Sequence, residues 1–155
     1  MDPVSPVVIQ EAPFGSPLYE EVTELRRALL RRPLGLDFTR EDLEREREDT
    51  HLAAVEGGRV VGTLLLRRVN ERTARIMRMA VAEDKQGRSI GRALVERAEA
   101  LARDAGFETV MMHARATAVG FYVKCGYASV GEEFLEQGIP HVRMEKLVAR
   151  ARDEA

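Results

Sequence analysis

The stretch from Ile76 to Ala114 decides the fold. It begins with Ile76-Met77-Arg78-Met79-Ala80-Val81, an apolar run of strand length, and continues into the loop Gln86-Gly87-Arg88-Ser89-Ile90-Gly91-Arg92-Ala93. From Ile90 to Asp104 the apolar residues recur with the period of an α-helix, and Thr109 to Ala114 is again typical of a strand. This order predicts a strand–helix–strand unit with a right-handed crossover.

The helix within this unit is expected to be amphipathic. Its outer face carries two predicted i,i+4 ion pairs, Arg92 with Glu96 and Glu99 with Arg103. Gly106 is a typical stop signal just beyond its last turn.

Two further helices are predicted before this unit. Ser16-Pro17 is typical of a helix cap followed by a first-turn proline, and the helix is expected to continue to about Leu30. Thr39, which acidic residues follow closely, is expected to cap a short second helix. The charged run from Glu44 to Asp49 is interpreted as the solvent-facing side of that second helix.

The remaining apolar runs predict the other strands of the sheet. Gly57-Gly58 lies between two such runs and is typical of a hairpin turn. The expected strands outside the central unit are residues 7–9, 52–55, 60–66, 127–130 and 142–147. These elements predict the α/β class, with a mixed, mostly antiparallel central sheet, a β-α-β core and helices on both faces.

Length and composition limit the class of protein. The 155 residues fit one domain, 1–155, with residues 1–6 as a frayed leader and 148–155 as a C-terminal tail. At this size about two-thirds of the unfolded surface can be buried, and 45% apolar residues supply a core. Because 24 basic residues nearly balance 26 acidic ones, the composition excludes a disordered chain.

Composition also limits the compartment and the partners. The N-terminus lacks the pattern of a secretion signal, and no apolar run reaches the about 20 residues of a membrane span. A single cysteine, Cys125, and three scattered histidines predict neither an internal disulfide nor a metal site. A net charge of −2 and 5% aromatic residues argue against nucleic-acid and membrane partners. The expected compartment is the cytoplasm.

The loop from Gln86 to Ala93 predicts an anion site. A helix N-terminus carries unpaired N–H groups and a partial positive charge, and the two loop glycines let backbone amides approach an anion closely. The loop also supplies a hydroxyl and two arginine side chains. It is neither a Walker loop nor a dinucleotide fingerprint. The alternative is an ordinary connection between strand and helix that contains two turn glycines.

This loop resembles a signature of a known family. Arg/Gln-x-x-Gly-x-Gly/Ala after an apolar strand is the acyl-CoA pyrophosphate motif of the GNAT superfamily of N-acetyltransferases, and Gln86 and Gly91 match its first and last positions. Ser89 replaces the middle glycine, which preserves the amide arrangement provided that residue 89 needs no positive φ. Downstream, Gly120-Phe121-Tyr122-Val123-Lys124-Cys125-Gly126-Tyr127 resembles the family's F-Y-x-K-x-G-F/Y element. Gly138 to Met144 is similar to an ElaA-like or YjcF-like bacterial branch.

The resemblance covers roughly residues 50–147 and implies a site for acetyl-CoA between two parallel strands. It implies that backbone groups of Met79, Ala80 and Val81 face the pantetheine arm. It also implies that Tyr122 lies near the acyl sulfur and donates the proton that the departing thiolate needs. The pyrophosphate would be held by Gln86, Gly87, Arg88, Ser89, Ile90, Gly91 and Arg92.

The sequence departs from the family pattern at two positions. Met77 stands where many relatives carry a glutamate on the strand, and Arg115 stands where an asparagine is frequent. The general base that deprotonates the amine is therefore open. The candidates, each of which can also be an ordinary loop or strand residue, are Glu132, Glu133, Glu136, His141 and His113.

The resemblance therefore predicts an N-acetyltransferase that moves an acetyl group from acetyl-CoA to a primary amine in a ternary complex. The expected partner is a small-molecule or peptide amine, held by the segment Gly131 to His141, and a homodimer through a sheet edge is compatible with the family. The alternative is a non-catalytic acyl-CoA-binding or regulatory module, which the missing strand glutamate favours and Tyr122 opposes.

Overall fold

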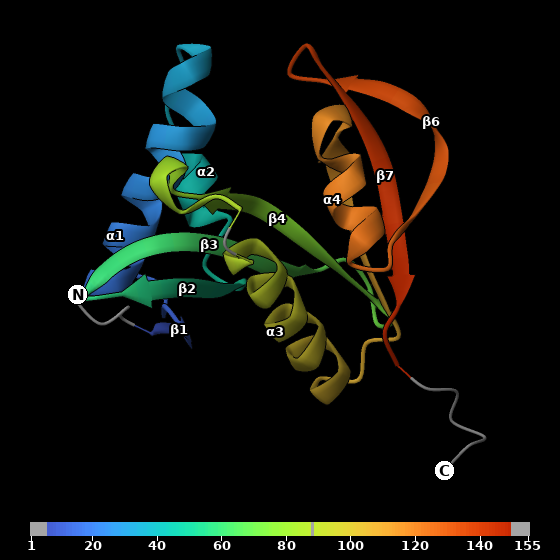
Figure 1. Cartoon of the computed structure of the whole chain (residues 1–155), viewed down its shortest axis with the longest axis horizontal. Helices are drawn as coiled ribbons and strands as arrows, with labels where there is room; N and C mark the ends of the chain where they lie inside the picture. The colour runs from blue at the N-terminus through green and yellow to red at the C-terminus, as the bar shows by residue number, and fades with distance from the viewer. Residues whose placement is uncertain (1–5, 88, 150–155) are drawn as a thin grey trace. The chain divides into compact units, whose positions relative to one another are not determined.

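A computed structural model describes residues 6–87 and 89–149 of the chain. It confirms the predicted mixed α/β class, with a seven-stranded sheet in the order β1-β2-β3-β4-β5-β7-β6. The described chain forms two compact units, and Figure 1 shows their elements. Unit 1 comprises residues up to 67 together with 78–98, and unit 2 comprises 68–77 together with the residues from 99 onward. The predicted leader up to residue 5, Arg88 and the tail from residue 150 lie outside the described residues.

The elements confirm most of the predicted helices and strands. The strands are β1 Val7–Glu11, β2 Thr50–Glu56, β3 Arg59–Arg68, β4 Thr73–Val81, β5 Thr109–Arg115, β6 Ala128–Glu136 and β7 Ile139–Leu147. The α-helices are α1 Pro17–Arg26, α2 Arg40–Glu44, α3 Ile90–Asp104 and α4 Val119–Lys124. A π-helical turn at Arg27–Arg31 extends α1 beyond its last α-helical residue. No described helix is long and apolar enough to cross a membrane.

Local side chains explain where the helices of unit 1 begin. The Ser16 hydroxyl accepts a hydrogen bond from the Tyr19 backbone N–H at 3.1 Å, which caps α1. The Thr39 hydroxyl accepts from the Asp42 N–H, and the Asp42 carboxylate accepts from the Thr39 N–H, so a reciprocal capping box opens α2.

Helices cover both faces of the sheet in unit 1. On one face, Val22 of α1 packs with Ala53 and Val60 in an apolar cluster. On the other face, a Cβ added to Gly62 of β3 would lie 3.0 Å from Ile90 and 3.1 Å from Leu94. A larger residue at position 62 would therefore push α3 away from the strand.

Unit 2 is organised around β5. Residues Thr73–Arg75 of β4 pair with Thr109–Met111 in parallel, and β7 pairs antiparallel with β5 along its whole length. The β6–β7 hairpin runs alongside α4 in Figure 1. The hairpin is longer than the predicted strands 127–130 and 142–147, because most of the segment from Gly131 to His141 belongs to β6 and β7.

Two predictions about charged residues were wrong. The run Glu44 to Asp49 is not the solvated face of a helix, since α2 ends at Glu44 and Glu46 is fully buried. Glu99 does not lie on an outer face with Arg103; it is buried in unit 2, where it accepts hydrogen bonds from Tyr127 and Lys146. The predicted pair of Arg92 with Glu96 is present at 3.2 Å. Helical spacing places residues on one face of a helix, but it does not show which other elements cover that face.

Candidate functional site

The loop before α3 has the backbone conformation of a tight strand-to-helix connection. Gly87 has a φ of +80°, and Ser89 has a φ of +63°. The Ser89 carbonyl accepts from the Ala93 N–H at 3.0 Å at the start of α3, and the first N–H groups of an α-helix lack a carbonyl one turn earlier. Gln86 folds back and donates its side-chain amide to the Val81 carbonyl at 3.0 Å. The arrangement fits an anion at the start of α3.

The sequence prediction assumed that Ser89 needs no positive φ, and the structure shows that its φ is positive. Its φ lies in the left-handed region that glycine adopts without cost, whereas other residues store strain there. Ser89 therefore keeps the glycine-like backbone at this position and carries the strain that a glycine would avoid.

The end of β4 contains a second strained residue. Arg78 has a φ of +53°, and its Nε lies 2.7 Å from Glu46 Oε2. Its guanidinium also lies 4.7 Å from the centre of the Phe38 ring. These contacts hold the unusual backbone immediately before Met79, Ala80 and Val81, the residues expected to face the pantetheine arm.

Tyr122 lies in the middle of α4 and is 6% exposed. Burial, with a smaller contribution from Cys125, holds the pKa of the Tyr122 phenol well above its ordinary value. The side chain packs against Phe121 and Tyr127. In the part of the chain that the structure describes, its hydroxyl has no hydrogen-bond partner. The phenol is therefore neutral and has a proton to donate.

A second group of side chains, all polar except for one phenylalanine, lies on one face of unit 2, and we call it the Glu136 cluster. It consists of Arg75, His113, Phe134, Glu136 and His141. Register explains the gathering: Phe134 is opposite His141, and Glu136 is opposite the residue two positions before His141. Paired residues and their i+2 neighbours share a face. The face therefore follows from the strand pairing.

Glu136 is the acidic centre of this cluster. One carboxylate oxygen lies 2.9 Å from His113 Nδ1, and the other lies 3.6 Å from His141 Nε2. Burial raises the pKa of Glu136, but the hydrogen bond from His113 and the charges of His113, His141 and Arg75 outweigh it, so the pKa is lowered overall. Because its side chain is 40% exposed, this carboxylate is open to a ligand.

The hydrogen bond at the other ring nitrogen fixes the tautomer of His141. Its Nδ1 lies 2.7 Å from the Ile139 carbonyl oxygen, which can only accept, so Nδ1 carries the hydrogen. In the neutral ring Nε2 is then the basic nitrogen, and it faces the Glu136 carboxylate. A proton taken up at Nε2 gains an ion pair with Glu136.

The Nδ1 atom of His113 has two contacts that cannot both be hydrogen bonds in one protonation state of the ring. Arg75 Nη2 lies 3.0 Å from this nitrogen and only donates, whereas Glu136 at 2.9 Å only accepts. Protonated Nδ1 bonds to Glu136, and deprotonated Nδ1 bonds to Arg75. The sequence did not indicate the part that Arg75 and Phe134 play, although their alternation along strands is a weak signal.

The structure does not bring all the sequence candidates together. Glu132 and Glu133 are exposed, in the stretch of β6 where the pairing with β7 shifts register. Met77, at the position of the family's strand glutamate, is partly buried. Among the described residues, no group of three or more His, Cys, Asp or Glu side chains is arranged to hold a metal ion.

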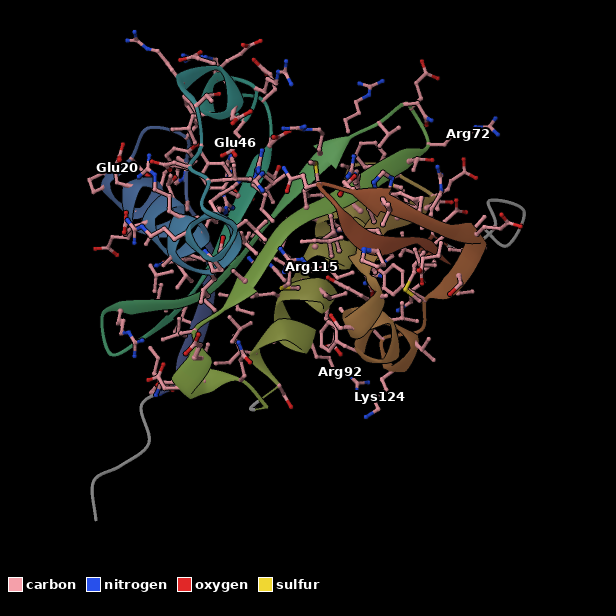
Figure 2. The ribbon with its side chains drawn as sticks, turned by 90° about the horizontal axis from the view of Figure 1, so that it is seen from above. Glu20, Glu46, Arg72, Arg92, Arg115 and Lys124 are labelled. Atoms are coloured by element: carbon pink, nitrogen blue, oxygen red, sulfur yellow. The ribbon has the colours of Figure 1, made fainter. Side chains whose placement is uncertain are left out.

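Unit 1 contains a polar cluster that the sequence analysis missed, and we call it the Glu46 cluster (Figure 2). Glu46 accepts from the Tyr19 hydroxyl at 2.7 Å and from Arg26 at 3.3 Å, in addition to its ion pair with Arg78. His51 bridges the group, with Nε2 donating to the Glu46 carbonyl and Nδ1 accepting from Arg26. Burial lowers the pKa of Arg26 to about 10.

Comparison with known proteins assigns the family. A family model described as an acetyltransferase (GNAT) domain matches residues 32–148. The uncharacterized N-acetyltransferase YjcF of Bacillus subtilis (strain 168) is 32% identical over 104 residues, which cover 66% of this chain and 74% of YjcF. For three relatives from that organism, the chain spans 65%, 67% and 74% of the relative's own length.

Solved structures share the fold. ElaA of Escherichia coli matches with a TM-score of 0.78 and 19% identity, over 90% of this chain and 99% of ElaA. A GNAT family acetyltransferase from Elizabethkingia anophelis, with acetyl-CoA bound, matches with a TM-score of 0.70 and 18% identity, over 91% and 97% of the two chains. At these identities the likeness concerns the fold.

The fold is thus that of the acyltransferases, a mixed sheet with a β-α-β core and a glycine-containing turn before its helix. Since the family model covers more than half of the sequence, this chain belongs to the GNAT family of acetyltransferases. The resemblance that the sequence suggested is confirmed at the level of the family.

Proposed function

We propose that this protein transfers an acetyl group from acetyl-CoA to a primary amine of a small molecule or peptide, by direct transfer in a ternary complex. Family membership carries the proposal, and the acetyl-CoA bound to the Elizabethkingia anophelis neighbour supports the choice of cosubstrate. The start of α3 would receive the pyrophosphate. There Gln86, Gly87, Ser89, Ile90, Gly91 and Arg92 would hold it with backbone N–H groups and side chains.

Tyr122 is the proposed general acid. The amine nitrogen forms a bond to the thioester carbonyl carbon, the carbon–sulfur bond breaks, and the sulfur leaves as a thiolate. The neutral Tyr122 phenol gives its proton to this thiolate, which ends the reaction as free CoA. The phenol is protonated across the neutral pH range, as a proton donor must be.

His141 is the proposed general base. A primary amine arrives mainly as an ammonium ion and must lose one proton before it can attack. His141 Nε2 would take that proton, and Glu136 would stabilise the resulting imidazolium as a positioning residue. Exposed Glu132 and Glu133 would attract the cation from solvent.

The test combines binding and turnover. Calorimetry with acetyl-CoA measures binding, and thiol release with a panel of primary amines measures transfer. Gly91→Glu would place a negative charge at the start of α3 and should weaken acetyl-CoA binding at least tenfold, about 1.4 kcal/mol. The control Leu147→Glu should bind normally, since Leu147 is 71% exposed at the end of β7 and belongs to neither motif of the resemblance.

The outcomes separate the candidate functions. Thiol release that depends on an amine supports the transferase. Tight acetyl-CoA binding with no turnover on any amine would instead indicate the non-catalytic acyl-CoA-binding module. Normal binding to the Gly91→Glu variant would show that the loop is not the cofactor site.

A further inference from the structure

Arg115 is the last residue of β5 and is directly opposite His141 in the register of β5 with β7. Paired residues in neighbouring strands point to the same face, so Arg115 shares the face of the Glu136 cluster. The chain then turns within three residues into α4, which carries Tyr122. Arg115 thus ends a strand of the parallel pair, and ligands of open α/β sheets bind at such carboxyl ends.

Arg115 is half-buried as a residue, and its side chain makes no hydrogen bond or ion pair with residues 6–87 or 89–149. The other arginines of this face are engaged: Arg143 pairs with Glu145 at 2.8 Å, and Arg75 lies 3.9 Å from Glu136. Among the described arginines of this face, Arg115 is therefore the one that forms no ion pair with an acidic side chain. Figure 2 labels Arg115 among the side chains.

An arginine that is partly desolvated without an acidic partner gains most from an anion with two coplanar oxygens, because its fork donates two parallel hydrogen bonds. The neighbouring His141 and Glu136 offer the opposite chemistry, an acceptor nitrogen and a carboxylate suited to an ammonium group. The face therefore presents a site for a cation beside a site for an anion.

We propose that the acceptor amine carries a carboxylate close to its amino group, as an α-amino acid does, and that Arg115 binds this carboxylate while Glu136 and His141 receive the amine. The proposal rests on the proposed acetyl transfer and narrows its acceptor class.

The first test compares acceptors with and without the carboxylate, and kcat/KM is expressed per neutral amine because the carboxamide also lowers the pKa of the neighbouring amine. The probes are α-amino acids and their α-carboxamides, supplied with acetyl-CoA, and thiol release gives kcat/KM for each pair. The carboxylate should be preferred by about 10- to 100-fold, the range expected for hydrogen bonds to a charged group. Spermidine and an N-acetyl-lysine amide serve as amines without a carboxylate.

The second test uses variants of the arginine. Arg115→Gln should abolish the preference, because kcat/KM for the amino acids should fall much further than that for the carboxamides. Arg115→Lys keeps the charge but not the fork and should retain part of the preference. The control is Arg72→Gln, because Arg72 is 81% exposed and lies in the turn before β4, away from this face.

Calorimetry of the same amino acids with the enzyme–CoA complex separates this proposal from the proposed function. If an amino acid binds to wild type and not to Arg115→Gln, the acceptor class stands even if no amine is acetylated, and only the transferase assignment fails. If spermidine or the lysine amide is acetylated and amino acids are neither acetylated nor bound, the transferase stands and the carboxylate proposal is overturned. A preference that survives in Arg115→Gln also overturns it.

Discussion

The Glu46 cluster of unit 1 and the Glu136 cluster of unit 2 are built from the same kinds of residue. Each places a glutamate among arginine, histidine and aromatic side chains. They differ in burial, since Glu46 is 0% exposed, whereas the Glu136 side chain is 40% exposed. The buried carboxylate has three protein partners and no access for a ligand. The exposed carboxylate of Glu136 contacts two histidines, and one side of it remains open to solvent.

The comparison shows that the same residue types contribute to stability where they are buried and remain available for reaction where they are exposed. A buried charge must be neutralised by partners that are always present, which makes Glu46 part of the folded framework. A half-exposed cluster can exchange a water molecule for a ligand and can change its protonation at little structural cost. The following predictions test this division, beginning with the largest effect.

Replacement of Glu46 should destabilise the protein most. Glu46→Gln leaves Arg26 and Arg78 buried without a counter-charge, so the free energy of unfolding should fall by about 3–5 kcal/mol. Glu136→Gln, at a carboxylate that water reaches, should change it by less than about 1 kcal/mol. Urea denaturation of both variants provides the measurement, and equal losses would contradict the distinction between the clusters.

Two of the buried tyrosines, Tyr122 and Tyr19, should respond in opposite ways. Tyr122→Phe removes the proposed acid and should lower kcat by about 100-fold, with acetyl-CoA affinity and stability nearly unchanged. Tyr19→Phe removes a hydrogen bond to Glu46 and should cost about 1–3 kcal/mol of stability while the folded enzyme keeps its kcat. Steady-state kinetics under conditions where chemistry limits the rate, together with urea denaturation, separates the two effects. An unchanged kcat for Tyr122→Phe rules out the acid role.

His51 should make the stability depend on pH. Burial, together with the nearby Arg26 charge, holds the pKa of His51 below its ordinary 6.5, although its contacts with Glu46 oppose this. Below pH 6.5 the unfolded chain binds a proton that the folded protein does not, so this contribution is complete above pH 6.5 and is lost as the pH falls. The slope is at most about 1.4 kcal/mol per pH unit. Denaturation curves at several pH values should lose this slope in His51→Gln.

The smallest change in stability is expected at Ser89, which belongs to neither cluster. Ser89→Gly should relieve the strain of a positive φ, offset in part by the greater freedom of glycine in the unfolded chain, and raise stability by about 0.5–1 kcal/mol. The control Gly87→Ala introduces strain at a φ of +80° where a Cβ meets no neighbour, and it should lower stability by about 1 kcal/mol. A destabilised Ser89→Gly variant would show that the serine hydroxyl contributes more than its backbone costs.

Local sequence signals predicted the elements well where the cause is local. Ser16 and Thr39 cap their helices as expected, Gly57-Gly58 forms the hairpin turn, and α3 spans the predicted residues. Caps, turns and helical periodicity depend on neighbours within about four residues, which the sequence displays directly. The family likewise followed from motifs that are continuous in sequence.

Only part of the candidate site could be predicted, because only part of it depends on residues that are close in sequence. Tyr122 and the loop before α3 belong to continuous motifs, whereas the Glu136 cluster joins residues from four strands, and its members become neighbours only through register. Glu136 and His113 were among the candidates for the base, but nothing in the sequence paired them with Arg75 or Phe134.

The sequence by itself determined most of the elements and the family, because caps, turns, helical periodicity and continuous motifs are all local in the sequence. Tertiary structure decided which charges are buried. Glu46 and Glu99 look like surface residues in their local context and are enclosed only when distant elements pack over them. Tertiary structure also left Arg115 without an acidic partner opposite His141 among the described residues, because strand register, and not chain proximity, selects the neighbours of a strand residue.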